Sequence, residues 1–194
     1  MSAHDEIRSL LEKFQQGYTR RDVTEVDTFM ELFTKDAEVI GTNGLRPGEG
    51  EWYLDRASAR ALVQGDWKGW GDLRLDMNSL SIHSRGFVGW VAAPATVTEE
   101  IGEEYYESYL NFAKNQIDDS TLSAEQKLLH ILREGMNTVY ELRRGKTFVW
   151  VLRLTAVVVR EQDGWKLAQV NFSFPTIYFP DVRLTEQRPG AGEQ

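Results

Sequence analysis

Apolar residues recur with two different periods along this chain of 194 residues. A spacing of three to four positions is typical of an amphipathic helix, and strict alternation is typical of a half-buried strand. The first pattern predicts helices at 3–20, 23–34 and 55–65, with Gly65 expected to end the third. The second predicts strands at 36–43, 73–83, 87–99, 148–162 and 165–174. Asp163-Gly164 predicts a hairpin turn between the last two strands.

Residues 100–143 interrupt the strands with a return to helical spacing. Tyr106, Tyr109 and Leu110 begin one apolar stripe, and Ser123 with Gln126 forms a capping box before a second. The segment 99–127 holds eight acidic and two basic residues, which is typical of a solvated helical face. We therefore expect a helical pair inserted between two strands.

Helices followed by long strands predict an α+β fold, in which a curved antiparallel sheet packs on the N-terminal helices. Such a sheet leaves a cleft between its concave face and the first helix, where ligands commonly bind. The strand 87–99 is apolar enough to be central or buried on both faces. We expect one domain over 1–180, including the insertion at 100–143, and a loose polar tail over 181–194.

Composition narrows the classes of function. The formal net charge of −8 argues against a nucleic-acid partner. No apolar run approaches the ~20 residues that a bilayer requires, so we expect no membrane partner and a cytoplasmic location. The chain has no cysteine, and its three histidines do not cluster. We expect no metal site and no cofactor.

Four stretches carry a resemblance to a known family: 7–18, 32–42, 66–73 and 164–173. Their order and spacing resemble the SnoaL-like branch of the nuclear transport factor 2-like superfamily, over about 1–98 and 145–175. The resemblance implies a cone-shaped α+β barrel with a pocket inside its open end. It also implies a homodimer formed through the sheet.

The resemblance constrains the chemistry. Ketosteroid isomerases of this superfamily place a proton-abstracting acid after the strand that corresponds to Ala37–Ile40, where this chain has Gly41-Thr42-Asn43. SnoaL-type cyclases carry a late acid, whereas Lys166–Pro175 has none. Catalytic roles are therefore assigned to Tyr18, which matches the first-helix tyrosine of the isomerases, and to Asp22 and Arg153. Their alternative roles are core packing, a helix end and a solvent-exposed strand position.

Aromatic and neutral polar residues complete the predicted pocket. The residues expected to line it are Phe29, Asn43, Trp67, Trp70, Trp90, Asn171 and Ser173. Core packing is the alternative for the aromatic residues, and local backbone hydrogen bonding is the alternative for the polar ones.

Two functions remain open from the sequence. The first is a pocket protein for a small, largely apolar molecule, with cofactor-free acid–base chemistry of the isomerase, dehydratase, cyclase or hydrolase type. The second is a non-catalytic interaction or dimerisation module, with the barrel filled by its own tryptophans and the helical pair as the interface. The helical pair could alternatively cover the open end of the cone.

Overall fold

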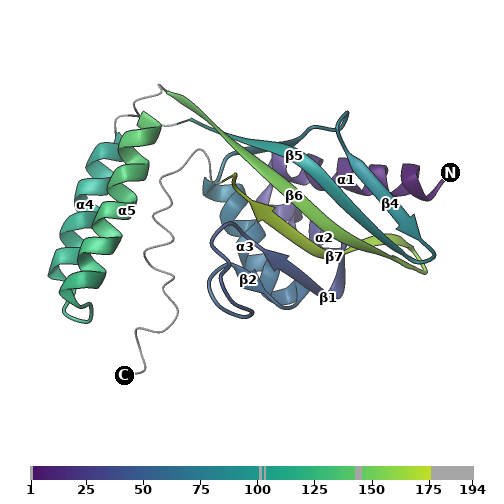
Figure 1. Ribbon diagram of the computed structural model, residues 1–194, viewed down its shortest axis with the longest axis horizontal. Helices are drawn as coiled ribbons and strands as arrows, with labels where there is room; N and C mark the ends of the chain where they lie inside the picture. Colours follow the sequence, from purple (N-terminus) through teal and green to yellow (C-terminus); the bar gives the residue numbers. More distant parts are fainter. Residues whose placement is uncertain (1, 101, 103, 143–145, 176–194) are drawn as a thin grey trace. The chain divides into compact units, whose positions relative to one another are not determined.

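The computed structural model describes residues 2–100, 102, 104–142 and 146–175. Contacts group the chain into two compact units, Met1–Thr98 with Val149–Pro175 and a second that contains Glu99–Phe148. We call the first the sheet unit (Figure 1). The predicted tail at 181–194 lies outside the described residues, as does part of the predicted single domain.

The sheet has seven strands in the order β2-β1-β7-β6-β5-β3, with β4 paired to β5. The strands are β1 Phe33–Ile40, β2 Trp52–Tyr53, β3 Asp72–Leu75, β4 Ser81–Arg85, β5 Val88–Glu100, β6 Thr147–Glu161 and β7 Gly164–Ser173. The predicted α+β fold with a curved sheet is confirmed, although β1 pairs with β7 in parallel. The turn at Gly164, where φ is 133°, joins β6 to β7 as the Asp-Gly pair predicts.

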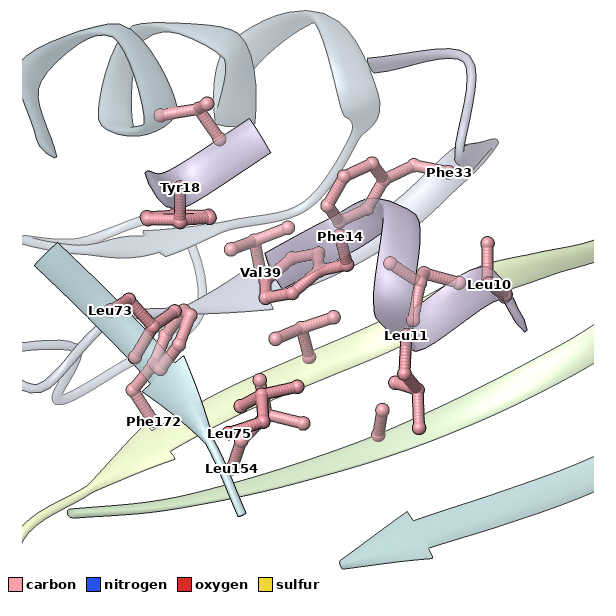
Figure 2. Close-up of a cluster of buried hydrophobic side chains, with 14 of the residues drawn as sticks. Leu10, Leu11, Phe14, Tyr18, Phe33, Val39, Leu73, Leu75, Leu154 and Phe172 are labelled. Atoms are coloured by element: carbon pink, nitrogen blue, oxygen red, sulfur yellow. The ribbon is translucent and has the colours of Figure 1, made fainter. Parts of the chain in front are cut away.

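Helices cover one face of this sheet. The helices of the sheet unit are α1 Ala3–Arg20, the short 3₁₀ helix Val23–Glu25, α2 Val26–Met30 and α3 Arg56–Gly69. A capping box of Ser2 and Asp5 begins α1, which packs across β3, β4 and β7. The side chain of Asp55 begins α3, which packs on β1 and β2. Side chains from α1, α2, α3 and the strands form one apolar core, part of which Figure 2 shows.

Two local predictions were wrong. Gly65 does not end α3, which continues to Gly69 because Trp67 on its next turn is buried in the core. The predicted strand 73–83 is split into β3 and β4 by a turn at Asp76, whose carboxylate accepts from Asn78 N and Ser79 Oγ. Of the two alternatives predicted for β5, the central position is the one observed, and the strand is buried on one face only, since its residues alternate between buried and exposed.

The predicted helical pair is present in the second unit. It consists of α4 Glu104–Asp118 and α5 Ala124–Leu142, two antiparallel helices that pack side by side (Figure 1). We call this pair the hairpin. Ser123 and Gln126 form the predicted capping box, in which each side chain accepts from the backbone N–H of the other residue. Across the described residues, no helix combines the length and apolar character needed to cross a bilayer.

Candidate functional site

A buried tyrosine and a carboxylate meet between α1 and α3. Tyr18 ends the apolar stripe of α1 and is 1% exposed. Its hydroxyl donates to Oδ2 of Asp66, 3.0 Å away. Asp66 lies in the last turns of α3 and is half-buried, so one side of the pair remains open to solvent. The pair therefore combines a buried hydroxyl donor with an acid that is partly accessible to solvent.

Burial sets the ionisation of this pair. It raises the pKa of Asp66 to about 7, because a carboxylate loses hydration there. The hydrogen bond from Tyr18 opposes this rise, and the negative charge of Glu51 adds to it. The pKa of Tyr18 is raised well above its usual value by burial and by the charge of Asp66. Near neutral pH Asp66 thus exists in both forms, whereas Tyr18 keeps its proton.

Aromatic rings surround the ring of Tyr18. Ring centroids lie 5.1 to 6.4 Å from that of Tyr18 for Phe14, Phe29, Trp67, Trp70 and Phe172. Figure 2 shows Phe14 and Tyr18 of α1 among the apolar side chains of the sheet. Phe29 and Trp67 are buried, whereas Trp70 is half-buried. An apolar ligand with a flat ring would contact surfaces of this kind.

Two details mark close packing around the pair. A Cβ on Gly17 would lie within 2.5 Å of the Phe29 ring, so only glycine lets α1 approach this closely. The indole Nε1 of Trp67 is buried and has no acceptor among the described residues. A buried donor without an acceptor costs about 1–3 kcal/mol, so a water molecule or a ligand oxygen would stabilise it.

Asn43 has a structural role that involves Glu51. The carboxylate of Glu51 accepts from the backbone N of Asn43 at 2.9 Å and from its Nδ2 at 3.3 Å. The backbone N of Gly41 donates to the carbonyl of Glu51 at 2.8 Å. A Cβ on Gly41 would collide with the Glu51 side chain, 2.4 Å from Oε2. These contacts fix the position of the second carboxylate that acts on Asp66.

The structure brings together some of the predicted site residues. Tyr18, Phe29, Trp67 and Trp70 share one cluster. Asp22 lies apart on the surface, where its carboxylate accepts from the backbone N and the hydroxyl of Thr24. It therefore caps a helix end, which was its alternative role.

The other predicted residues lie on the exposed face of the sheet. Arg153 is exposed on β6. Trp90 on β5 is 44% exposed and stacks on His83 of β4 at 5.5 Å. Asn171 and Ser173 are half-buried and alternate on β7 with the buried Phe172, so they point away from the aromatic cluster. None of these four residues contributes to the Tyr18–Asp66 site.

Sequence reasoning missed Asp66. A signal for it exists, because Asp66 follows Leu62 by four positions and Val63 by three, which places it on the apolar stripe of α3. An acid on such a stripe is costly to bury and therefore informative. The expected stop at Gly65 left Asp66 in a loop and hid this signal.

A separate groove of about 470 Å³ lies between α1 and the turn that joins β6 to β7. Four of its charged side chains pair with one another, Glu6 with Arg160 at 3.2 Å and Asp163 with Lys166 at 2.8 Å. We regard it as a weaker candidate because these pairs engage four of its five charged side chains, of which Lys13 is the fifth. Within the described residues, no cluster of histidine and acidic side chains could hold a metal ion.

Comparisons with known proteins point to the fold. No family model matches the sequence, and no curated protein matches it. Among solved structures, a nuclear transport factor 2-like superfamily protein from Salmonella enterica aligns with a TM-score of 0.54 and 14% identity, over 99% of this chain and 96% of the other. A protein with a cystatin-like fold from Novosphingobium aromaticivorans aligns with a TM-score of 0.56 and 12% identity, over 95% and 89%.

A third solved structure, from Streptomyces avermitilis, is named as a candidate dehydratase of the nuclear transport factor 2-like family. It aligns with a TM-score of 0.55 and 12% identity, over 89% of this chain and 96% of the other. The chain has the nuclear transport factor 2-like fold. The predicted resemblance is confirmed at this level, whereas the SnoaL-like branch stays a prediction. Identities this low establish the fold and leave the activity to be argued from the site.

Proposed function

We propose that this nuclear transport factor 2-like chain binds a small, largely apolar molecule beside Tyr18 and Asp66 and catalyses a cofactor-free proton transfer on it. The observation that carries the proposal is the hydrogen bond between Tyr18 and an acid whose pKa lies at about 7. A general acid–base group works best when its pKa is close to the working pH. Asp66 meets this condition, whereas Asp22 and Arg153 lie outside the site.

The chemistry follows from the polar groups that are present. The Asp66 carboxylate removes a proton from a carbon next to a carbonyl, and the electrons of the C–H bond pass to the carbonyl oxygen. Protonated Asp66 then returns the proton to another carbon, which isomerises the substrate, or gives it to a departing hydroxyl, which releases water. The buried N–H of Trp67 is a suitable donor to the carbonyl oxygen. The candidate dehydratase of the same fold supports the second reaction, the release of water.

Exchange of ketone α-protons tests the proposal without knowledge of the natural substrate. We would incubate 2-tetralone with the protein in D₂O and follow the loss of its α-proton signals by NMR. The protein should accelerate exchange, and the acceleration should rise with pH and level off above about 7, where Asp66 is ionised. Asp66→Asn should reduce it by about 100-fold or more.

Asp22→Asn is the matched control, because it makes the same change at an exposed cap. It should leave exchange unchanged. Tyr18→Phe should lower the rate, because the buried hydroxyl no longer orients the ligand. It should also shift the pH midpoint of the rate upward, because the hydrogen bond that lowers the pKa of Asp66 is lost while burial and the charge of Glu51 still raise that pKa. A rate unchanged in Asp66→Asn would remove the catalytic part of the proposal. Native mass spectrometry of the purified protein tests the ligand-binding part of the proposal separately.

A specific observation favours the second candidate function, a non-catalytic module with a filled barrel. Tyr18, Phe29 and Trp67 are each at most 6% exposed and pack on one another. In that case the bond between Tyr18 and Asp66 only positions α3 on α1. Native mass spectrometry that finds no co-purified small molecule, together with no exchange of 2-tetralone, would favour this function.

A further inference from the structure

The hairpin has apolar side chains that its own packing does not bury. None of the described side chains of α4 and α5 is buried. Two polar contacts join the helices: Tyr109 Oη donates to the carbonyl of Ile131 at 2.7 Å, and His130 Nδ1 lies 2.7 Å from Gln116 Oε1. A Cβ on Gly135 would lie 2.5 Å from the Tyr109 hydroxyl, so glycine permits this contact.

Large apolar side chains form a row along each helix, away from this contact. The row on α4 is Tyr106, Leu110 and Ile117, and the row on α5 is Leu128, Leu132, Met136 and Val139; these residues are 39% to 65% exposed. Spacings of three, four and seven keep each row on one side of its helix. Both helices are therefore amphipathic, with the apolar side facing outward.

The two rows lie on the same face of the hairpin. At about 100° per residue, the α4 row is turned by roughly 90° from Tyr109 and Gln116, which face α5. The α5 row is turned by roughly 120° in the same sense from His130 and Gly135, which face α4. In antiparallel helices, equal senses of rotation carry both rows to one side. We call this side the apolar face of the hairpin.

The chemistry of the apolar face indicates its partner. Rows spaced at three and four positions suit knobs-into-holes packing against other helices, rather than a sheet or a small molecule. The acidic balance of 99–127 disfavours an anionic membrane surface.

A second copy of the chain supplies a surface that matches in spacing and length. From their exposed fractions, the seven side chains have a combined solvent-accessible area on the order of 700 Å² per copy. This is close to the ~800 Å² that each partner buries in a stable interface. A two-fold axis would place the two apolar faces against each other as a four-helix bundle. We propose that two copies associate through the apolar faces of their hairpins.

Sedimentation equilibrium over a wide range of concentrations tests this proposal. The wild-type protein should be dimeric, and Leu110→Glu combined with Ile117→Glu should raise the dimer Kd by at least about 100-fold, because each would bury an unpaired carboxylate. Asn111→Glu with Asn115→Glu is the matched control, since it adds the same charge to exposed positions on the opposite side of α4. The control pair should remain dimeric.

Two results would overturn the proposal. Val151→Glu, on the exposed face of β6, would yield monomers if the sheet formed the dimer. A wild-type chain that is monomeric at every concentration would also overturn it. Tryptophan fluorescence checks separately that the sheet unit is folded, because all six tryptophans lie in that unit.

Cross-linking gives a second measurement. The chain has no cysteine, so Leu132→Cys creates a single reactive thiol on the apolar face. A short bis-maleimide should link two copies of this variant efficiently and two copies of Asn111→Cys poorly. Equal yields from the two variants would contradict the proposed face.

Discussion

The Tyr18–Asp66 site and the apolar face of the hairpin are opposites in their relation to solvent. At the first, a buried tyrosine packs among aromatic rings and donates to a half-buried acid. At the second, apolar side chains are exposed around a polar contact between two helices. In both regions the feature that costs free energy in the isolated chain is the one that indicates function. A carboxyl group with a raised pKa is suited to proton transfer, and an uncovered apolar face is suited to association.

Truncating one apolar side chain in each region should give the largest difference between them in the free energy of unfolding. Phe14 is 1% exposed and contacts the rings of Tyr18, Phe29, Phe33 and Phe172. Phe14→Ala should lower the free energy of unfolding of the sheet unit by about 3–5 kcal/mol, because it leaves a cavity. Leu110→Ala, on a residue that is 65% exposed, should change it by less than about 0.5 kcal/mol.

Urea unfolding monitored by tryptophan fluorescence measures both variants, since all the tryptophans lie in the sheet unit. Comparable losses for Phe14→Ala and Leu110→Ala would mean that the hairpin row is buried against the sheet unit. That result would erase the contrast between the regions.

The pH dependence of stability tests whether the pKa of Asp66 is raised in the folded state. The folded state raises the pKa of Asp66 to about 7, so between about pH 4 and 7 it binds a proton that the unfolded chain has released. Stability should therefore fall as pH rises through this window, by on the order of 3 kcal/mol from this group, and the loss should be complete above about pH 7.

Asp66→Asn should remove this contribution. The variant should match the wild-type protein near pH 4 and be more stable near pH 8, because the amide cannot ionise and still accepts from Tyr18. Asp22→Asn serves as the control and should leave the slope between pH 4 and 7 unchanged. An identical pH dependence for Asp66→Asn and the wild-type protein would show that Asp66 has an ordinary pKa.

Two glycines allow the same substitution in both regions, with a smaller expected effect. Gly17→Ala places a methyl group against the buried ring of Phe29 and should destabilise the sheet unit by about 1–3 kcal/mol, despite the better helix propensity of alanine. Gly135→Ala meets the hydroxyl end of the half-buried Tyr109, which can move aside. Its cost should be below about 1 kcal/mol.

Thermal unfolding followed by circular dichroism and by tryptophan fluorescence distinguishes the two glycine variants. Gly65→Ala is the control, because a Cβ there meets no atom within 4 Å and should stabilise α3 by about 0.5–1 kcal/mol. A stabilised Gly17→Ala would mean that α1 and α2 have room to separate.

The candidate site was only partly predictable from the sequence, for reasons that concern particular residues. Tyr18 lies on a regular apolar stripe, so its burial was predictable. Asp66 was missed because glycine at position 65 usually ends a helix, whereas here the burial of Trp67 continues it. Trp90 and Arg153 were predicted to line the pocket because of their residue types. Whether such strand residues face the pocket or solvent depends on which face of the sheet the helices cover.

The sequence alone determined the order of helices and strands, the inserted hairpin and the α+β fold, because periodicity and turn residues act over a few neighbouring positions. Only the tertiary structure decided that Tyr18 meets Asp66, 48 positions apart, and that the row on α4 shares a face with the row on α5. Such pairings depend on how helices pack across long loops. They then determine which acid loses its hydration and which apolar side chains remain exposed.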